Sequence, residues 1–291
     1  MKLKDRRKVI PQYLLPKRRL TMLAGRYASR EGGRGMLPTI RWFVRKYGVD
    51  MSEAAEPDVA RYASFNDFFT RALKPGARPL ADAELICPVD GSISQFGRIE
   101  HDQILQAKGH RYSTTALVGG DATLAQRFHD GSFATLYLSP RDYHRIHMPC
   151  DGRLVRMIHV PGDLFSVNPT TARGVPGLFA RNERVVCVFE RMREEAGAEP
   201  EIFALILVGA TIVGSMATVW HGVINAPRVK RVREWGYDNE AIVLDKGEEM
   251  GRFMLGSTVV LLFPQGPLAF NRSWEPGRAI RVGEAMADRS E

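Results

Sequence analysis

The spacing of apolar residues in this 291-residue sequence changes near residue 80, and that change limits the fold more than any other feature. Before it, apolar residues recur at the three- or four-residue spacing of amphipathic helices. After it come short apolar runs separated by glycine and proline, which are typical of buried strands. Residues 74–79, Lys-Pro-Gly-Ala-Arg-Pro, break the chain between the two parts. We therefore predict an α+β fold, with a helical lobe over residues 1–80 and a β-rich core over residues 81–291.

The apolar runs of the second part predict individual strands. Residues 131–138, 183–190 and 257–263 are almost continuously apolar, so we expect strands with both faces buried. Residues 202–220 carry no charge and are long enough to cross a bilayer. Gly209 and Gly214 interrupt this stretch, and polar residues dilute it. Two buried strands joined at a glycine fit it better than a transmembrane helix.

The first part carries a helix signal and most of the positive charge. Ser64 and Asp67 have the spacing of a capping box, which predicts a short helix with Phe65, Phe68, Phe69 and Ala72 on one face. Residues 1–46 hold 14 of the 41 lysines and arginines but only 2 of the 33 acidic residues, which leaves 27 basic and 31 acidic residues in the remainder. The basic character therefore belongs to one end of the chain.

Apolar stripes accompany these charges and indicate a membrane surface. Basic residues beside an apolar, aromatic stripe suit a helix lying in the interface of an anionic bilayer. The alternative is that the stripes pack on the protein core and the charges are solvated. Nucleic-acid binding is not favoured, because no recognised motif accompanies the charge. The two stripes, each at i, i+3, i+4, i+7 spacing, are Leu20, Leu23, Ala24 and Tyr27, and Ile40, Phe43, Val44 and Tyr47.

Cysteine usage indicates a reducing compartment. Cys87, Cys150 and Cys187 are far apart, lack C-x-x-C spacing and cannot all pair within one chain. We expect buried free thiols. No secretory signal is visible, because no continuous apolar segment precedes Pro11 and Pro16.

The segment Leu255-Gly256-Ser257-Thr258 carries a specific chemical possibility. A serine after a glycine can attack the preceding carbonyl and convert the amide to an ester. Elimination then leaves dehydroalanine, and loss of ammonia converts it to a pyruvoyl group. Ser257 stands at the start of a predicted strand, where a tight turn holds the carbonyl near the hydroxyl. Gly-Ser alone is common and usually marks a turn, so the evidence depends on companion residues.

Self-cleavage requires a base and a carboxylate that orients it. His144 and His147 stand out as possible bases, and Asp90 stands out in a turn after a short apolar run. Each has a plainer reading. Two histidines three residues apart could bind a metal, but no third ligand with metal-like spacing is evident, so we expect no metal site. An Asp-Gly pair is most often a turn.

Taken together, these segments resemble the membrane-associated bacterial phosphatidylserine decarboxylase proenzymes. The resemblance extends over nearly the whole chain, and seven blocks in the same order are far more specific than the cleavage tetrapeptide. The blocks are residues 64–71, 88–94, 137–149, 162–169, 182–185, 208–215 and 246–258.

The resemblance implies roles for particular residues. Asp90, His147 and Ser257 would form the charge relay for self-cleavage, with His147 taking the hydroxyl proton and Asp90 setting its tautomer. Cleavage between Gly256 and Ser257 would give a large chain, residues 1–256, and a small chain, residues 257–291. Ser257 would become the pyruvoyl cofactor.

The resemblance also implies the second reaction. The pyruvoyl ketone would form a Schiff base with phosphatidylserine and act as an electron sink while carbon dioxide leaves. His144 is the candidate donor of the returning proton, and Ser166 and Asn168 are candidates for lining the substrate site. The protein would be a homodimer bound peripherally to the cytoplasmic face of the cell membrane.

Three other functions stay open at this point. A soluble pyruvoyl-dependent decarboxylase of free amino acids would share the cofactor but have no use for residues 1–46. A non-catalytic, basic membrane-binding module would leave Ser257 uncleaved. A serine hydrolase is the weakest alternative, because Ser257 lacks the G-x-S-x-G context.

Overall fold

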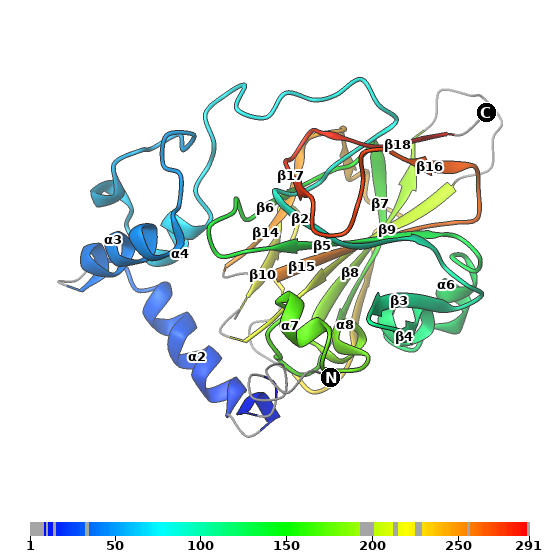
Figure 1. The fold of residues 1–291 in the computed structure, drawn as a ribbon, viewed down its shortest axis with the longest axis horizontal. Helices are drawn as coiled ribbons and strands as arrows, with labels where there is room; N and C mark the ends of the chain where they lie inside the picture. Colours follow the sequence, from blue (N-terminus) through cyan, green and yellow to red (C-terminus); the bar gives the residue numbers. More distant parts are fainter. Residues whose placement is uncertain are drawn as a thin grey trace.

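The computed structural model describes residues 9, 11–13, 16–32, 35–192, 201–211, 215–224, 229–254 and 257–289. Among the described residues, the two longest helices lie before residue 80 and all the named strands come after it, so the α+β prediction is confirmed (Figure 1). The elements before residue 80 are α2 (Lys17–Ala28), α3 (Met36–Tyr47), the 3₁₀ turn η1 (Val59–Arg61) and α4 (Phe65–Phe69).

The strands form four antiparallel sheets within the part of the chain that the structure describes. The largest has the order β12-β7-β8-β9-β15-β5-β2-β17, with β13 also paired to β7. The others have the orders β11-β10-β14-β6, β1-β18-β16 and β3-β4. The strands are β1 (Leu85–Ile86), β2 (Gly91–Arg98), β3 (Gln103–Ala107), β4 (His110–Ser113), β5 (Ser132–Leu138), β6 (Arg145–His147), β7 (Gly152–Val160), β8 (Arg184–Arg191), β9 (Glu201–Val208), β10 (Met216–Thr218), β11 (Gly222–Val223), β12 (Arg233–Gly236), β13 (Val243–Leu244), β14 (Glu249–Phe253), β15 (Ser257–Phe263), β16 (Leu268–Phe270), β17 (Ala279–Ile280) and β18 (Ala285–Arg289).

The central strands of the largest sheet are buried on both faces, as their sequence predicted. In β15, Val259 and Leu261 point into one hydrophobic cluster, whereas Val260 and Leu262 point into another. Successive side chains of a strand face opposite sides, so a strand covered on both sides must be apolar at every position. The first cluster lies against the strands of the smaller sheets. The second lies against the hairpin β3-β4 and short helices, namely α5 (Thr114–Leu117), α6 (Ala122–Gln126), α7 (Pro169–Ala172) and α8 (Leu178–Arg181).

The strand predictions agree with the structure. The runs at residues 131–138, 183–190 and 257–263 correspond to β5, β8 and β15. Residues 202–220 contribute to the two strands β9 and β10, with Gly209 after the first of them, and residues 212–214 lie outside the described residues. Among the described residues, no helix is both long and apolar enough to cross a membrane. The three cysteines are free and buried, as expected.

The short helix α4 forms the core of the helical lobe. Its predicted cap is confirmed, because the Ser64 side chain accepts a hydrogen bond from the Asp67 backbone N–H at 3.0 Å. Phe65, Phe68 and Phe69 are buried in a cluster with residues of α3 and with Ala28 of α2. This cluster is separate from the two clusters of the sheet.

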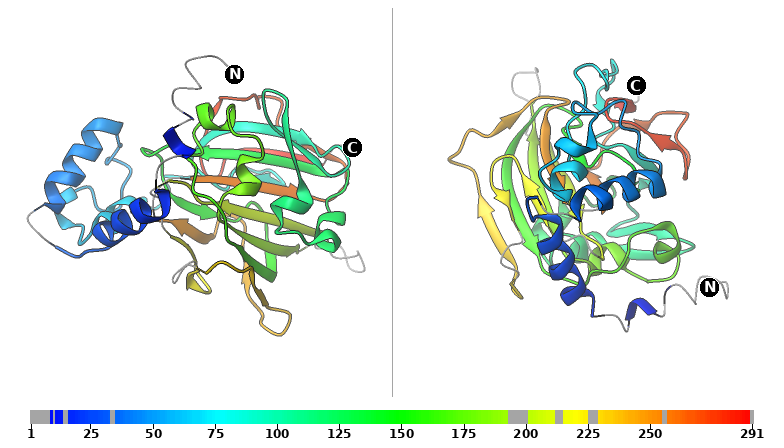
Figure 2. Two further views of the ribbon diagram at one scale, coloured as in Figure 1. Left: turned by 90° about the horizontal axis from the view of Figure 1, so that it is seen from below. Right: turned by 90° about the vertical axis from the view of Figure 1, so that its left-hand side faces the viewer.

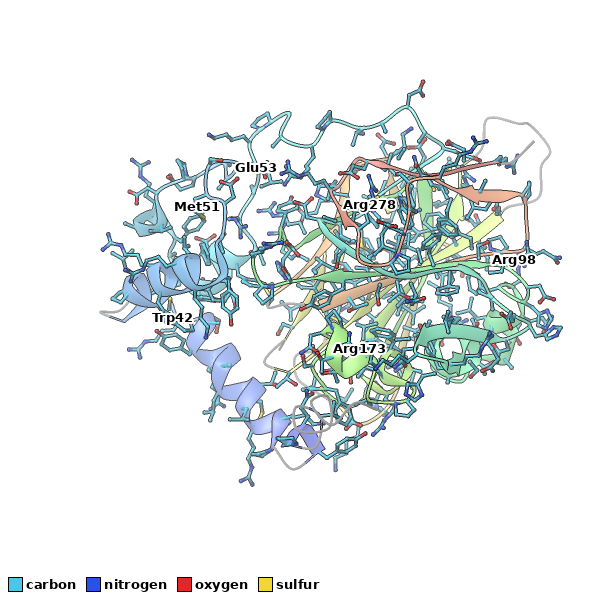
Figure 3. The ribbon with its side chains drawn as sticks, in the orientation of Figure 1. Trp42, Met51, Glu53, Arg98, Arg173 and Arg278 are labelled. Carbon is cyan, nitrogen blue, oxygen red and sulfur yellow. The ribbon has the colours of Figure 1, made fainter. Side chains whose placement is uncertain are left out.

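Charged side chains connect the lobe to the sheets. Figures 1 and 2 show α2, α3 and α4 on one side of the strands. The carboxylate of Glu53, which lies in the lobe (Figure 3), accepts a hydrogen bond from Arg78 at 2.7 Å, and Arg78 also donates to Asp90 of the core at 2.9 Å. Arg145 of β6 donates to the Thr70 carbonyl at the end of α4 at 2.8 Å. Both arginines lie next to the residues that the sequence identified as chemical candidates.

Candidate active site

The Leu-Gly-Ser-Thr segment places Ser257 at one end of the largest sheet. Ser257 is the first residue of β15 and lies opposite Leu138, the last residue of β5. The prediction that a strand begins at Ser257 is confirmed. Leu255, Gly256 and the side chain of Ser257 lie outside the described residues.

The backbone brings the segments of the other two relay candidates to the same end of the sheet. In the order β15-β5-β2, Asp90 immediately precedes β2, two strands from Ser257. The backbone N–H of His147 donates to the carbonyl of Pro88 at 2.8 Å, so β6 lies against the segment that carries Asp90. The segments that carry Asp90 and His147 therefore lie at the same end of the sheet as Ser257, although Ser257 is more than 100 positions away from both in the sequence.

The turn at Asp90 requires a glycine at position 91, whereas an ordinary surface turn accepts several residue types. A β-carbon on Gly91 would lie 2.3 Å from the carbonyl oxygen of Tyr137, which is too close for any side chain. Only glycine therefore lets β2 begin so near β5. The Asp90-Gly91 pair is part of the sheet packing that surrounds the candidate site.

Asp90 is buried, and its carboxylate is held by groups other than His147. Arg78 donates from Nε to Oδ1 at 2.9 Å and from Nη2 to Oδ2 at 2.5 Å. The backbone N–H of Val282 also donates to Oδ1 at 2.9 Å. The expected hydrogen bond between Asp90 and His147 is absent among the described residues, because these donors already occupy the carboxylate.

His147 is held in one tautomer by the backbone. Its Nδ1 lies 2.7 Å from the Gly247 carbonyl oxygen, which can only accept, so Nδ1 carries the proton. In the structure this carbonyl, rather than Asp90, selects the tautomer. Nε2 then has a lone pair, which accepts from the Tyr143 hydroxyl at 3.1 Å. Burial lowers the pKa of His147, and it raises the pKa of Tyr143 to about 12. The imidazole is therefore suited to act as a base at neutral pH.

His144 is completely buried beneath the helical lobe. Its ring lies 4.1 Å from that of Phe69 in α4, measured between centroids. Nδ1 donates to the Asp142 carbonyl at 2.8 Å, and Nε2 is buried without a hydrogen-bond partner among the described residues. Burial lowers its pKa to about 3, so the ring is neutral. In this state Nε2 can accept a proton but has none to donate.

Ser166 and Asn168 form a structured turn at the start of α7. The Asn168 side chain caps the helix by accepting from Thr171 N–H at 2.9 Å, and it donates to Ser166 Oγ at 2.8 Å. The backbone N–H of Ser166 donates to the side chain of Gln12 at 2.9 Å. The loop predicted to line the substrate site is thus in contact with the N-terminal segment.

The same loop approaches the end of the sheet that carries Ser257. Asn182 donates from Nδ2 to the carbonyls of Phe165 and Gly209, both at 2.8 Å. Gly209 follows Val208, which lies opposite Thr258 in β15. The predicted site residues that the structure describes therefore belong to elements near the same end of β15.

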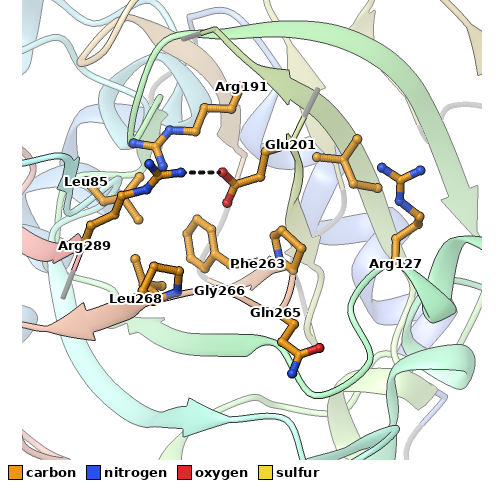
Figure 4. A pocket seen from close by; sticks show the side chains of 12 residues that line it. Leu85, Arg127, Arg191, Glu201, Phe263, Gln265, Gly266, Leu268 and Arg289 are labelled. Carbon is orange, nitrogen blue, oxygen red and sulfur yellow. Dashed lines mark ion pairs between the residues drawn. The ribbon is translucent and has the colours of Figure 1, made fainter. Parts of the chain in front are cut away.

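Among the cavities lined by described residues, two of similar size lie on different sides of the core. One, of about 350 Å³, includes Arg71, Arg78, Asp90 and Tyr143 in its wall. The other, of about 330 Å³, lies at the opposite end of β15, near Phe263 (Figure 4). An ion pair between Arg289 and Glu201, 3.7 Å apart, lies in the wall of the second cavity. Only the first cavity borders the candidate site.

Tyr143, Gly247 and Arg78 are site residues that the sequence did not single out. Tyr143 precedes His147 by four positions within a motif already noted, so its proximity was a usable signal. Gly247 acts through a backbone carbonyl, which any residue type carries. Arg78 lies in the segment interpreted only as a chain break.

Comparison with known proteins covers nearly the whole chain. The phosphatidylserine decarboxylase family profile matches residues 65–288, and a second profile, described as PSD, matches residues 7–48. A phosphatidylserine decarboxylase proenzyme of Polaromonas naphthalenivorans is 72% identical over 287 residues, which cover 98% of this chain and 97% of that protein. The proenzyme of Variovorax paradoxus is 70% identical over 284 residues, covering 98% of each chain.

Proposed function

We infer that this chain, which belongs to the phosphatidylserine decarboxylase family, is a carboxy-lyase that converts phosphatidylserine to phosphatidylethanolamine and carbon dioxide in phospholipid biosynthesis. The observation that carries this conclusion is the match to decarboxylase proenzymes over nearly the full length of both chains. The chain is accordingly a zymogen.

We propose that the zymogen cleaves itself between Gly256 and Ser257, giving chains of residues 1–256 and 257–291. Two observations support this. The strand β15 begins at Ser257, at the same end of the sheet as the segment that carries Asp90. His147 presents a lone pair at Nε2, and burial keeps its ring neutral. The base that takes the serine proton would be Nε2, which requires that the Tyr143 hydroxyl shift from it or pass the proton on.

The role of Asp90 in this proposal is electrostatic rather than a direct hydrogen bond. Arg78 and the Val282 N–H fix its carboxylate near the turn before β2. A fixed negative charge stabilises the imidazolium that forms as His147 takes the proton. The Gly247 carbonyl meanwhile keeps the Nδ1 proton in place.

The cofactor proposed for the second reaction is the pyruvoyl group formed from Ser257. When present, it supplies an electron-accepting carbonyl for decarboxylation. The buried Nε2 of His144 can hold a proton only transiently, because its surroundings favour the neutral ring. His144 would therefore have to receive a proton before returning it to the substrate carbon. Ser166 and Asn168 remain the proposed substrate-contacting residues.

We further propose that the helical lobe, residues 1–80, holds the core, residues 81–291, at the surface of an anionic membrane. Leu20, Met22, Leu23 and Tyr27 are exposed on α2 beside exposed Arg19 and Arg26. Exposed apolar residues next to basic ones suit insertion into the headgroup region. The cytoplasmic face and a homodimeric assembly are parts of the same proposal.

Intact-mass measurement of the purified full chain, with and without hydroxylamine, tests cleavage and cofactor together. We expect two fragments, of which the smaller begins at residue 257 and gains the mass of the carbonyl adduct. Ser257→Ala should leave one 32.6 kDa chain without decarboxylase activity. The matched control is Ser273→Ala, a serine in an exposed turn, which should be processed like the wild type.

Two results would contradict the proposal. Cleavage of Ser257→Ala at the same position would remove Ser257 as the nucleophile. A processed wild-type chain that decarboxylates free amino acids but not phosphatidylserine vesicles would favour the soluble alternative.

A further inference from the structure

Two histidines and an aspartate meet at the end of the core farthest from the helical lobe. His101 follows the end of β2, whereas His129 and Asp130 precede the start of β5. Arg98, the last residue of β2, marks this end of the molecule in Figure 3. β2 runs for 8 residues from the turn at Asp90. At ~3.3 Å per residue the cluster is therefore ~23 Å from the proposed site.

The potential ligand atoms of the three side chains converge. His101 Nδ1 lies 3.5 Å from Asp130 Oδ1, and His129 Nδ1 lies 3.0 Å from Asp130 Oδ2. One nitrogen or oxygen from each of the three residues lies within 4.8 Å of those from the other two. Around a tetrahedral zinc ion with bonds of about 2.0–2.2 Å, neighbouring ligand atoms are roughly 3.3 Å apart. Small side-chain rotations are enough to reach that spacing.

The backbone holds the two turns together independently of the side chains. The His101 N–H donates to Asp130 Oδ1 at 2.8 Å, and the Asp130 N–H donates to the His101 carbonyl at 3.1 Å. The Arg98 side chain donates to the Asp130 carbonyl at 2.9 Å. These bonds fix the backbone positions of the two turns, so little conformational entropy of the backbone is lost when a ligand brings the side chains together.

His101 and Asp130 both have left-handed backbone conformations, with φ of 57° and 52°. This conformation is unfavourable for a residue with a β-carbon, and it persists only where neighbouring contacts impose it. The side chain of His101 is 84% exposed, so it can rotate without disturbing the core.

We propose that His101, His129 and Asp130 bind a divalent transition-metal ion of the zinc class, with water completing the coordination. Two imidazoles and one carboxylate are a ligand set that such ions prefer, whereas calcium and magnesium prefer oxygen ligands alone. The hydrogen bond from the His101 backbone N–H lowers the pKa of the Asp130 carboxyl. The ion would join the turn after β2 to the turn before β5, far from the reacting groups. This site is independent of the proposed decarboxylase chemistry.

The plainer interpretation is a surface cluster in which both imidazoles contact the Asp130 carboxylate and no metal ion is bound. Saturable binding of Zn²⁺ that requires both histidines separates the two interpretations.

The test uses the full chain without an affinity tag, freed of metal with a chelator and titrated with Zn²⁺ against a chromophoric competitor. We expect saturable binding of one ion per chain, unaffected by excess Mg²⁺. His101→Asn and His129→Asn should weaken binding by at least about tenfold, the smallest effect typical even of outer-shell changes. Asparagine suits position 101, because it tolerates the left-handed conformation. Substitution of Co²⁺ should give an absorption band that both variants lose.

The matched control is His221→Asn, an exposed histidine on another sheet that contacts Trp235. It should bind Zn²⁺ like the wild type. Circular dichroism spectra identical to that of the wild type would show that all the variants are folded. The site is refuted if the wild type shows no saturable binding, or if His101→Asn and His129→Asn bind as tightly as His221→Asn.

Discussion

Helices α2 and α3 have the same length, 12 residues each, and both combine an apolar stripe with basic residues. Their surroundings are opposite. The stripe of α3 includes Ile40 and Phe43, which are buried against α4. The stripe of α2 includes Leu20 and Leu23, which are 39% and 62% exposed. Of the two alternatives that the sequence left open, packing on the protein applies to α3, whereas the stripe of α2 is exposed, as the proposed contact with a membrane requires.

The partner of α3 explains the difference. The ring of Phe43 lies 5.1 Å from that of Phe65, 6.0 Å from that of Phe68 and 5.9 Å from that of Phe69, measured between centroids. These phenylalanines occupy one short helix, α4, and their rings pack against Phe43 of α3. α2 contributes only Ala28 to the same cluster, so its large apolar residues remain uncovered. An apolar stripe thus indicates that a face will be buried, but not by what.

The largest effect that we predict concerns Phe43. Phe43→Ala should lower the free energy of unfolding by about 3–5 kcal/mol, because it leaves a cavity among three aromatic rings. Urea unfolding in the Ser257→Ala background, where processing does not differ between variants, measures this loss. The matched control is Trp42→Ala, the neighbouring residue on α3, which is 49% exposed and should change stability by less than about 1 kcal/mol. Equal losses in the two variants would mean that α3 is not the packed helix.

The second prediction concerns Leu23 on α2. Leu23→Ser should weaken binding to anionic vesicles by about 1.5–3 kcal/mol, or roughly 10- to 100-fold, because it removes an inserting side chain. Stability in solution should hardly change. Sedimentation with vesicles measures the partition coefficient. Val232→Ser, which alters an exposed apolar residue of the core, is the control and should bind like the wild type. The assignment of α2 fails if Leu23→Ser unfolds the protein while vesicle binding persists.

The third prediction concerns how the free energy of unfolding depends on pH through His144, which is buried next to Phe69 of α4. His144 has an ordinary pKa of 6.5 when the chain is unfolded and about 3 when it is buried next to Phe69 and Arg71. Between these values the unfolded chain binds the proton and the folded one does not. Stability should therefore fall as the pH drops from about 6.5 towards about 3, by at most about 1.4 kcal/mol per pH unit.

Urea unfolding at a series of pH values, with His144→Gln as the comparison, isolates this contribution. The variant should show a flatter profile over the same interval. Parallel profiles would mean that His144 is not buried as a neutral ring in solution. The vesicle affinity of α2 at low ionic strength should not follow this transition, because α2 does not contact His144.

The smallest predicted effect concerns the charge on α2. Arg26→Gln should reduce affinity for anionic vesicles by about 1 kcal/mol, or about fivefold, and should reduce its dependence on salt. Titration with vesicles at two ionic strengths measures both quantities. Arg272→Gln removes the same charge from an exposed position of the core and serves as the control. If both variants lose affinity equally, net charge rather than α2 directs the protein to the surface.

The sequence could supply candidate site residues because the proposed chemistry requires particular residue types. Gly256-Ser257 is common on its own, but its place in an ordered series of seven blocks that also contain Asp90 and His147 is specific. The contacts of these residues could not be predicted in the same way. The acceptor of the His147 Nδ1 proton is a backbone carbonyl 100 positions away, and every residue has such a carbonyl. Arg78 looked like part of a chain break, although its guanidinium holds Asp90.

The sequence by itself determined the α+β class, the strands β5, β8 and β15, the cap of α4 and the family, because each depends on local pattern or on residue identity. Only the tertiary structure decided which basic helix is covered, which group orients His147 and how deeply His144 is buried. Those outcomes depend on distances between residues remote in sequence. Periodicity and motif spacing indicate which helix, strand or reactive group a segment can form. The residues that lie next to it in the folded chain determine whether a helix face is covered and which group accepts a histidine proton.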